Sequence, residues 1–384
     1  MKKLNSLLRL LIAGIFLVGM FAACEGPEGP MGPKGDKGDK GDPGDPGPGS
    51  VVNWEGYKEG IICAQCHNPD YDTLYYVWAR KASWAFSKHA NGGAYTENAG
   101  RCSYCHTTEG MIQATLGQPI TDHSLSSPIG CFACHSPHSR ADFSLRTVAP
   151  VTLQAGVVGE PNQTFDFGDG NLCANCHRPR VPEYGSSNIS PMPDPTKTAE
   201  TDTIVITTSR WYQHYGVQAP MLAGYNGFEF QGYTFQNSYH TTASAILDQG
   251  CAICHMAEDV ETTLGGHSMN LANEEGEELT VGCTVTGCHS APMELDYDGV
   301  QTDTQLLLDS LKSLLLVGKN GRPWITASNS CNASTNNPLK IAPAYVSGAM
   351  YNYFFVLHDL SLGVHNTKYA QQLLEASIEV FNAN

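Results

Sequence analysis

Hydrophobic residues are unevenly distributed along the chain, and the first group lies at the N-terminus. An apolar run covers Leu10–Ala23 and follows the basic residues Lys2, Lys3 and Arg9. A charged segment followed by an apolar run too short to cross a bilayer comfortably is typical of a secretory signal. We therefore expect residues 1–23 to be a signal peptide, with a retained membrane anchor as the alternative.

Two apolar patterns near the C-terminus have the spacing of helices. Seven leucines predict a helix over Thr304–Val317 that ends at Gly318; they are Leu306, Leu307, Leu308, Leu311, Leu314, Leu315 and Leu316. A second helix is expected after His365, with Asn366 or Thr367 as its cap. Its buried stripe would contain Leu373, Leu374, Ile378 and Phe381.

The segment behind the N-terminal run is polar and repetitive. Glycine recurs at every third position from Gly26 to Gly47, and such collagen-like triplets have too few apolar side chains to form a core. Cys24 follows two alanines, as in the lipobox of bacterial lipoproteins, although Phe21 is bulkier than the usual leucine. We expect residues 24–50 to be a lipidated Cys24 and a solvated linker, and residues 51–384 to be the folded domain. Cleavage near Cys24 without lipidation and trimerisation through the triplets are the alternatives.

The cysteines carry the chemistry. Of the 14 cysteines, 12 form pairs followed at once by histidine. The six motifs begin at Cys63, Cys102, Cys131, Cys173, Cys251 and Cys283; their second cysteines are Cys66, Cys105, Cys134, Cys176, Cys254 and Cys288, and their histidines are His67, His106, His135, His177, His255 and His289. The first five have the strict spacing C-x-x-C-H, whereas the sixth has four residues between its cysteines.

C-x-x-C-H is the attachment signature of c-type haem. Each cysteine can form a thioether to a vinyl group, and the histidine that follows is then the proximal ligand of the iron. Zinc knuckles and disulfides use paired cysteines too, but neither requires a histidine directly after each pair. We therefore predict six haem c groups. Five is the alternative if the longer sixth motif does not bind haem.

Eight histidines remain as distal ligands, and six bis-histidine irons need six of them. The candidates are His89, His123, His138, His214, His240, His267 and His365, with His358 as a weaker one. His138 stands three residues after His135, and three residues span at most about 10 Å. Because that is too short to pass around the edge of the ring, His138 can serve only a neighbouring haem. The sequence leaves open which two of the eight are spare.

Several of these segments resemble multihaem c-type cytochromes. The order W-x-x-S-x-H-A from Trp84 to Ala90, Cys254-His255-Met256 with a later GGH, and GVHN before the last helix are similar to segments of pentahaem nitrite reductases and their octahaem relatives. The likeness covers residues 60–384 loosely. It implies a mainly α fold with extensive loops and little β structure, organised around closely packed haems that supply most of the apolar core.

The same resemblance bears on activity. The nitrite reductases carry an open active-site haem, commonly with lysine in place of the proximal histidine, but no C-x-x-C-K occurs here. The organisation is closer to that of lipid-anchored surface cytochromes of metal-respiring bacteria. With 38 acidic against 22 basic residues, the chain should repel nucleic acid and suit redox partners.

We therefore expect electron transfer, without catalytic residues, in anaerobic respiration or extracellular electron transfer. The protein would be exported and anchored by lipid to the outer membrane, on its periplasmic or cell-surface side. Its partners would be other redox proteins or extracellular electron acceptors. An oxidoreductase with one open haem acting on a small nitrogen or sulfur compound, and a haem-stacked filament formed by self-association, are the alternatives. The donor, the acceptor, the haem potentials, the oligomeric state and the role of Cys331 stay open.

Overall fold

The structure is a computed structural model, and it describes residues 67–70, 72, 75–140, 143–179, 191–258, 263–290 and 293–384. All of them lie in one compact unit, Gly49–Asn384. The expected signal peptide, Cys24, the glycine-rich linker, and Cys63 and Cys66 of the first motif lie outside the described residues.

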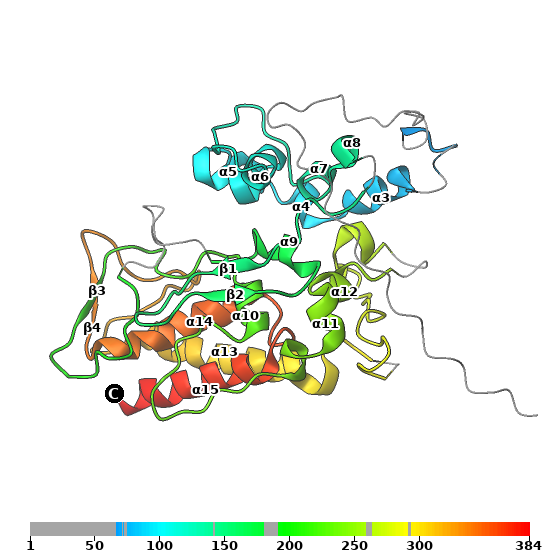
Figure 1. The fold of residues 1–384 in the computed structure, drawn as a ribbon. Coiled ribbons are helices and arrows are strands. Elements are labelled where there is room, and N and C mark those ends of the chain that lie inside the picture. The colour runs from blue at the N-terminus through cyan, green and yellow to red at the C-terminus, as the bar shows by residue number, and fades with distance from the viewer. Residues whose placement is uncertain are drawn as a thin grey trace, which may run out of the picture. The chain divides into compact units, whose positions relative to one another are not determined.

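Short helices joined by loops make up the first part of the described chain (Figure 1). They are α3 Val77–Trp84, α4 Lys88–Asn91, the 3-10 turn η2 Ala94–Thr96, α5 Gly100–His106, α6 Thr108–Thr115, α7 Cys131–Cys134 and α8 Pro137–Arg140. Helices this short are marginal alone, so tertiary contacts must hold them. The Ser87 side chain caps α4 by accepting a hydrogen bond from the Ala90 N–H.

The middle of the chain contains more short helices and small strands. The helices are α9 Gly170–Ala174, α10 Gln218–Ala223, η4 Tyr239–Thr241, α11 Ser244–Gln249, α12 Ala252–His255, η5 Gly266–Ser268 and η6 Tyr297–Gly299. β1 Val151–Leu153 pairs antiparallel with β2 Gln163–Phe165, with Val151 opposite Phe165. β3 Ile204–Ile206 pairs antiparallel with β4 Leu339–Ile341, with Ile204 opposite Ile341. The expectation of a mainly helical, loop-rich fold with little β structure is confirmed.

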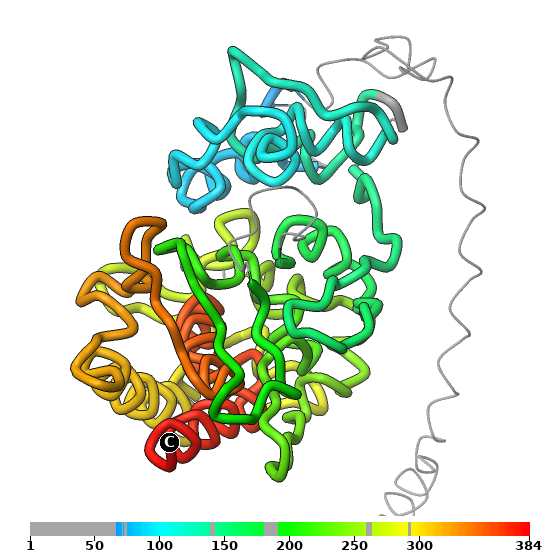
Figure 2. Tube along the Cα trace, turned by 90° about the vertical axis from the view of Figure 1, so that its left-hand side faces the viewer, coloured from blue at the N-terminus to red at the C-terminus, as the bar shows by residue number. Residues whose placement is uncertain are grey.

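Three long helices form the C-terminal part. α13 Val300–Val317, α14 Ser347–Asp359 and α15 Thr367–Ala383 lie side by side, and the short η7 Ala344–Val346 precedes α14 (Figures 1 and 2). Their core contains Trp211, Tyr351, Phe354, Leu315 and Leu373, all buried. Our expectation that haems supply most of the apolar core is therefore wrong for this part, because protein side chains fill it by themselves.

The two helices expected from leucine spacing are present. α13 begins four residues earlier than predicted and ends at Gly318, as expected. On α15, Leu373, Leu374 and Phe381 are buried, while Ile378 is only partly so. Asn366 occupies the N-cap position, but its side chain does not cap the helix. It instead accepts from the Ser238 N–H and donates to the Met221 carbonyl, so it connects α15 to the chain before η4.

Helix α14 was not predicted from the sequence. Nearly all of its residues are buried, so it lacks the polar stripe that marks a surface helix. Cys331 is also buried, and burial raises the pKa of its thiol to about 12. This favours an idle thiol over the intermolecular disulfide that the sequence left open. Among the described residues, no helix has both the length and the apolar character that a membrane span requires.

Candidate haem-binding site

In three of the strict motifs the histidine lies one helical turn from the first cysteine. The N–H of the histidine donates to the carbonyl of the first cysteine in three strict motifs: His135 to Cys131 at 2.8 Å, His177 to Cys173 at 2.9 Å, and His255 to Cys251 at 3.0 Å. This closed turn keeps the three reactive side chains of a motif near one another.

The sixth motif keeps the same closing bond in spite of its two extra residues. The N–H of His289 donates to the carbonyl of Cys283 at 3.0 Å. The additional residues form turns, and Gly287 adopts a left-handed conformation with φ +89°, which favours glycine. The longer spacing is thus absorbed in a loop, and the ends of the motif keep the relationship seen in the strict ones.

Each motif histidine faces one histidine from outside the motifs. The ring centres are 6.1 Å apart for His67–His138, 6.0 Å for His106–His214, 6.3 Å for His135–His267, 6.1 Å for His177–His89, 6.2 Å for His255–His365 and 5.9 Å for His289–His240. His138 faces His67 of the first motif, not its neighbour His135. The pairs thus join parts of the chain that are far apart in sequence.

These separations fit an iron between two imidazoles. With a metal–nitrogen bond of about 2 Å and the ring centre about 1 Å beyond the nitrogen, two opposite imidazoles have centres about 6 Å apart. Among the described residues, no group of three or more His, Cys, Asp or Glu side chains could hold a metal ion. Each pair offers two ligands only, which suits an iron whose other four positions belong to a porphyrin.

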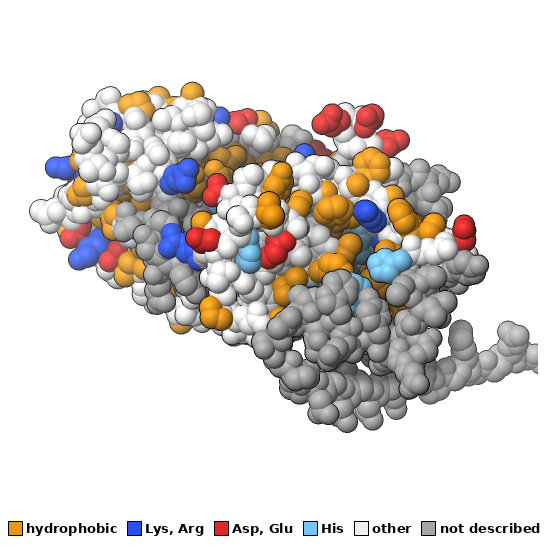
Figure 3. Space-filling model, turned by 90° about the horizontal axis from the view of Figure 1, so that it is seen from above, with side chains coloured by type: hydrophobic (Ala, Val, Ile, Leu, Met, Phe, Trp, Pro, Cys, Tyr) orange, Lys and Arg blue, Asp and Glu red, His pale blue; other side chains and the backbone are white. Residues whose placement is uncertain are grey.

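The described cysteines agree with this interpretation. All ten motif cysteines from Cys102 to Cys288 are free thiols, and so is Cys331. In the part of the chain that the structure describes, the disulfide alternative therefore has no support. One face of the molecule brings histidine and hydrophobic side chains to the surface beside one another (Figure 3).

Burial keeps several of the paired imidazoles neutral. Burial and, to a smaller extent, the facing His177 lower the pKa of His89 to about 4. Burial also lowers the pKa of His267 to about 4, with smaller contributions from Arg80 and His135. A neutral imidazole has the free lone pair that metal ligation requires. These histidines are therefore ready to bind iron at neutral pH.

The second nitrogen of several paired imidazoles is held by the protein. Nδ1 lies 3.2 Å from the Ala94 carbonyl in His106, 3.0 Å from Gln218 Oε1 in His177, 2.8 Å from the Val364 carbonyl in His240, and 3.0 Å from the Met269 carbonyl in His255. Such bonds orient a metal-bound imidazole and direct Nε2 toward the metal.

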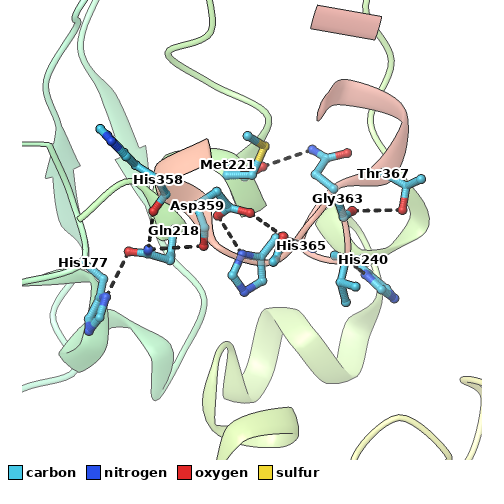
Figure 4. A network of polar contacts seen from close by, with 12 residues as sticks. His177, Gln218, Met221, His240, His358, Asp359, Gly363, His365 and Thr367 are labelled. Atoms are coloured by element: carbon cyan, nitrogen blue, oxygen red, sulfur yellow. Dashed lines mark hydrogen bonds and ion pairs between the residues drawn. The ribbon is translucent and has the colours of Figure 1, made fainter. Parts of the chain in front are cut away.

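His365 differs, because its Nδ1 lies 2.7 Å from a carboxylate oxygen of Asp359 (Figure 4). The charge of Asp359 and this hydrogen bond outweigh burial and raise the pKa of His365. Sequence reasoning missed both Asp359 and Gln218. Neither belongs to a motif, and no local pattern separates them from the many other acidic and amide residues of the chain.

Two histidines lie apart from the six pairs. His123, one of the predicted distal candidates, has its Nε2 3.1 Å from Gln113 Oε1. The weaker candidate His358 is buried against the rings of Tyr212, Tyr215 and Phe354. The geometry therefore gives no support to His123 as a ligand, whereas it brings His214, an equally uncertain candidate in sequence, opposite His106.

Neighbouring motifs contact one another. The Tyr104 hydroxyl of the second motif donates to Asn175 Oδ1 of the fourth at 2.9 Å. Ala133 and Cys134 of the third motif share a hydrophobic cluster with Cys176 of the fourth.

The fourth motif also meets the fifth, and the fifth meets the sixth. Ala174 of the fourth motif, Ile253 and Cys254 of the fifth and Val285 of the sixth share one hydrophobic cluster. A methyl group on Gly282 would lie 2.5 Å from the Ile253 carbonyl oxygen, so glycine is required where the fifth and sixth motifs approach.

Comparison with known proteins points to the same chemistry. No family model matches the chain. It is 24% identical over 348 residues to the C-type polyheme cytochrome OmcC of Geobacter sulfurreducens, which covers 74% of this chain and 43% of the relative. It is also 24% identical over 371 residues to OmcB of the same species, with 85% and 44% covered. The chain therefore spans less than half the length of these curated relatives.

A solved structure is also similar, that of the outer cell wall cytochrome OcwA. The TM-score is 0.47 at 20% sequence identity, with 79% of this chain and 50% of that chain covered. The repeated attachment motifs, the opposed histidines and the polyhaem relatives have one common explanation: this chain is a multihaem c-type cytochrome, with haem c as its cofactor.

Proposed function

We propose that this chain transfers electrons through six covalently bound haem c groups, each with two histidine ligands. The observation that carries the proposal is the set of six histidine pairs. Every pair combines one motif histidine with one histidine from elsewhere, at ring-centre distances between 5.9 and 6.3 Å. An iron held in this way has both axial positions filled by the protein.

The motif cysteines would form the thioethers, including Cys63 and Cys66, whose histidine His67 faces His138. Bound haem c would supply one-electron exchange between ferric and ferrous iron. The twelve paired histidines would hold the axial positions, so a small substrate would find none free. This favours electron transfer over an oxidoreductase with an open haem.

The contacts between motifs support a branched route. The fourth motif contacts the second and the third, and it shares a hydrophobic cluster with the fifth, which in turn approaches the sixth. The first joins the third through His138, which stands three residues after His135 and faces His67. We infer that electrons pass between the haems of contacting motifs, with the fourth motif as the junction.

The rest of the chain supports a role outside the cytoplasm. The N-terminal signal pattern and Cys24 favour export and a lipid anchor on the outer membrane. The acidic composition, with net charge −16, favours positively charged partners or acceptors. Other redox proteins and extracellular electron acceptors fit this role. The match covers 43% and 44% of the relatives, so we infer that this chain corresponds to one segment of such a protein.

Haem counting and EPR spectroscopy of the full-length, haem-loaded protein test the proposal. We expect six haems by pyridine haemochrome and only low-spin signals in the oxidised protein. A high-spin component equal to one haem, shifted by nitrite or hydroxylamine, would contradict it and favour the oxidoreductase.

A pair of histidine variants sharpens this test. His267→Ala removes one proposed axial ligand and should convert one haem in six to high spin. His123→Ala is the matched control, because His123 lies outside the pairs, and it should leave the spectrum unchanged. A high-spin signal in the control instead would show that the ligands are wrongly assigned.

A further inference from the structure

The C-terminal end of α14 contains a buried carboxylate that the proposed function does not use. Asp359 is 1% exposed. Its Oδ1 lies 2.7 Å from His365 Nδ1, and its Oδ2 accepts from the Ser361 hydroxyl. Among the described residues, His365 is its one ion-pair partner. A buried charge is costly unless it is compensated. The compensating positive charge for Asp359 is therefore expected on the His365 imidazole or on the metal that His365 would bind.

The other recorded Nδ1 contacts of paired histidines go to neutral oxygens, those of Ala94, Gln218, Val364 and Met269. The contrast between His365 and the other histidines is clearest for His177, whose partner Gln218 also forms a hydrogen bond to the end of α14. Its Oε1 faces His177, and its Nε2 donates to the carbonyl of Asp359 at 3.3 Å (Figure 4). The end of α14 thus supports two proposed ligands. His177 is supported through the amide of Gln218, and His365 through the carboxylate of Asp359.

We propose that Asp359 is a positioning residue that lowers the reduction potential of the haem bound by His255 and His365. The proposal rests on the proposed function, in which these two histidines are the axial ligands of one iron. A carboxylate at Nδ1 increases the electron donation of the imidazole, and its negative charge stabilises the more positive ferric state. The haem of the fifth motif is therefore harder to reduce than it would be with a neutral oxygen at this place.

The redox step balances without a proton. His255 and His365 would hold the iron while one electron passes to it from a neighbouring ferrous haem, which would become ferric. The hydrogen bond between His365 Nδ1 and Asp359 Oδ1 is kept in both states. Only the charge at the iron changes, so the carboxylate acts through electrostatics and through the basicity of His365.

Asp359→Asn tests the proposal, because it keeps an acceptor oxygen and the side-chain shape while it removes the charge. We expect the reduction equilibrium of one haem to change by about tenfold in favour of the ferrous form, a rise of about 59 mV for a one-electron couple. Potentiometric titration followed by absorption and by EPR gives the potential. The low-spin signal of that haem should also change its g values.

His358→Phe is the matched control. His358 is the buried neighbour of Asp359, packs among aromatic rings, and lies outside the histidine pairs. It should leave all the potentials unchanged. Equal shifts in both variants would mean that the end of α14 acts only through packing, and this would overturn the proposal.

A second variant decides the matter if Asp359→Asn does not fold. Ser361→Ala removes the donor to Oδ2, which leaves more negative charge to act on His365, so the potential should fall. If Asp359→Asn has six low-spin haems and unchanged potentials, the role of Asp359 is overturned and the proposed function stands. If Asp359→Asn does not fold, the same result in Ser361→Ala has the same meaning. A wild-type haem count or spin state other than six low-spin haems would overturn the proposed function itself.

Discussion

The first and last parts of the described chain are stabilised in different ways. Between residues 67 and 146, Met111 and Ala133 are the buried hydrophobic residues among those described, and α3 has no buried residue at all. Trp78 and Phe86 in this part are 52% and 57% exposed. In α14, by contrast, nearly every side chain is buried, and α13 and α15 cover it with further apolar residues.

The difference predicts which part depends on bound haem for its stability. Full burial of a large apolar side chain stabilises a fold by about 1.5–3 kcal/mol, and residues 67–146 have very few such side chains. The same residues contain the second and third motifs and His67 of the first. Covalently bound haems would supply the apolar surface that the short helices need. The three long helices have no such need.

The largest expected effect comes from removal of haem. We predict that the full-length chain made without haem attachment leaves residues 75–140 unprotected from hydrogen exchange, while α13, α14 and α15 keep their protection. Exchange followed by mass spectrometry, with the haem-loaded chain as reference, measures both parts at once. Equal protection of the two parts would show that residues 75–140 fold on their own side chains.

The second prediction concerns a substitution in the hydrophobic core of the C-terminal helices. Phe354→Ala should destabilise α13, α14 and α15 by about 3–5 kcal/mol, because it leaves a cavity among buried rings. Leu306→Ala, at a 59% exposed position on α13, is the control and should change stability by less than about 0.5 kcal/mol. Denaturant-dependent hydrogen exchange measures both. A similar loss in the two variants would mean that this core is not closely packed.

A smaller effect should appear as the pH falls. Burial lowers the pKa of His358 to about 4, below its ordinary value of about 6.5. Between these values the unfolded chain binds more protons than the folded chain, so the stability of the C-terminal core should fall as the pH drops from about 6.5 to 4. The loss is about 3 kcal/mol.

His358→Phe should flatten this dependence, since it removes the titrating group and keeps the aromatic packing. Unfolding of α14 at several pH values measures the slope in both proteins. A slope that persists in the variant would assign the acid sensitivity to another group.

Local chemistry could be predicted from sequence to a large extent. A c-type attachment motif occupies five to seven consecutive residues, so the cysteines and the histidine that follows are recognisable without the fold. The leucine pattern of α13 was equally visible. α14 was not, because a helix buried on all sides lacks a polar stripe. The bond from His289 to Cys283 shows that the two extra residues of the sixth motif form a loop, and haem binding by this motif stays a prediction.

The sequence by itself determined that this protein carries several haem c groups, because attachment needs only residues that are neighbours in the chain. Tertiary structure alone decided which histidines face each other. His214, more than 100 residues from His106, lies opposite it, whereas His123, only 17 residues away, does not. It also decided that Asp359 lies against His365. Both the pairing of histidines and the contact of Asp359 with His365 depend on distances between residues that are remote in sequence. The packing of the whole chain sets those distances.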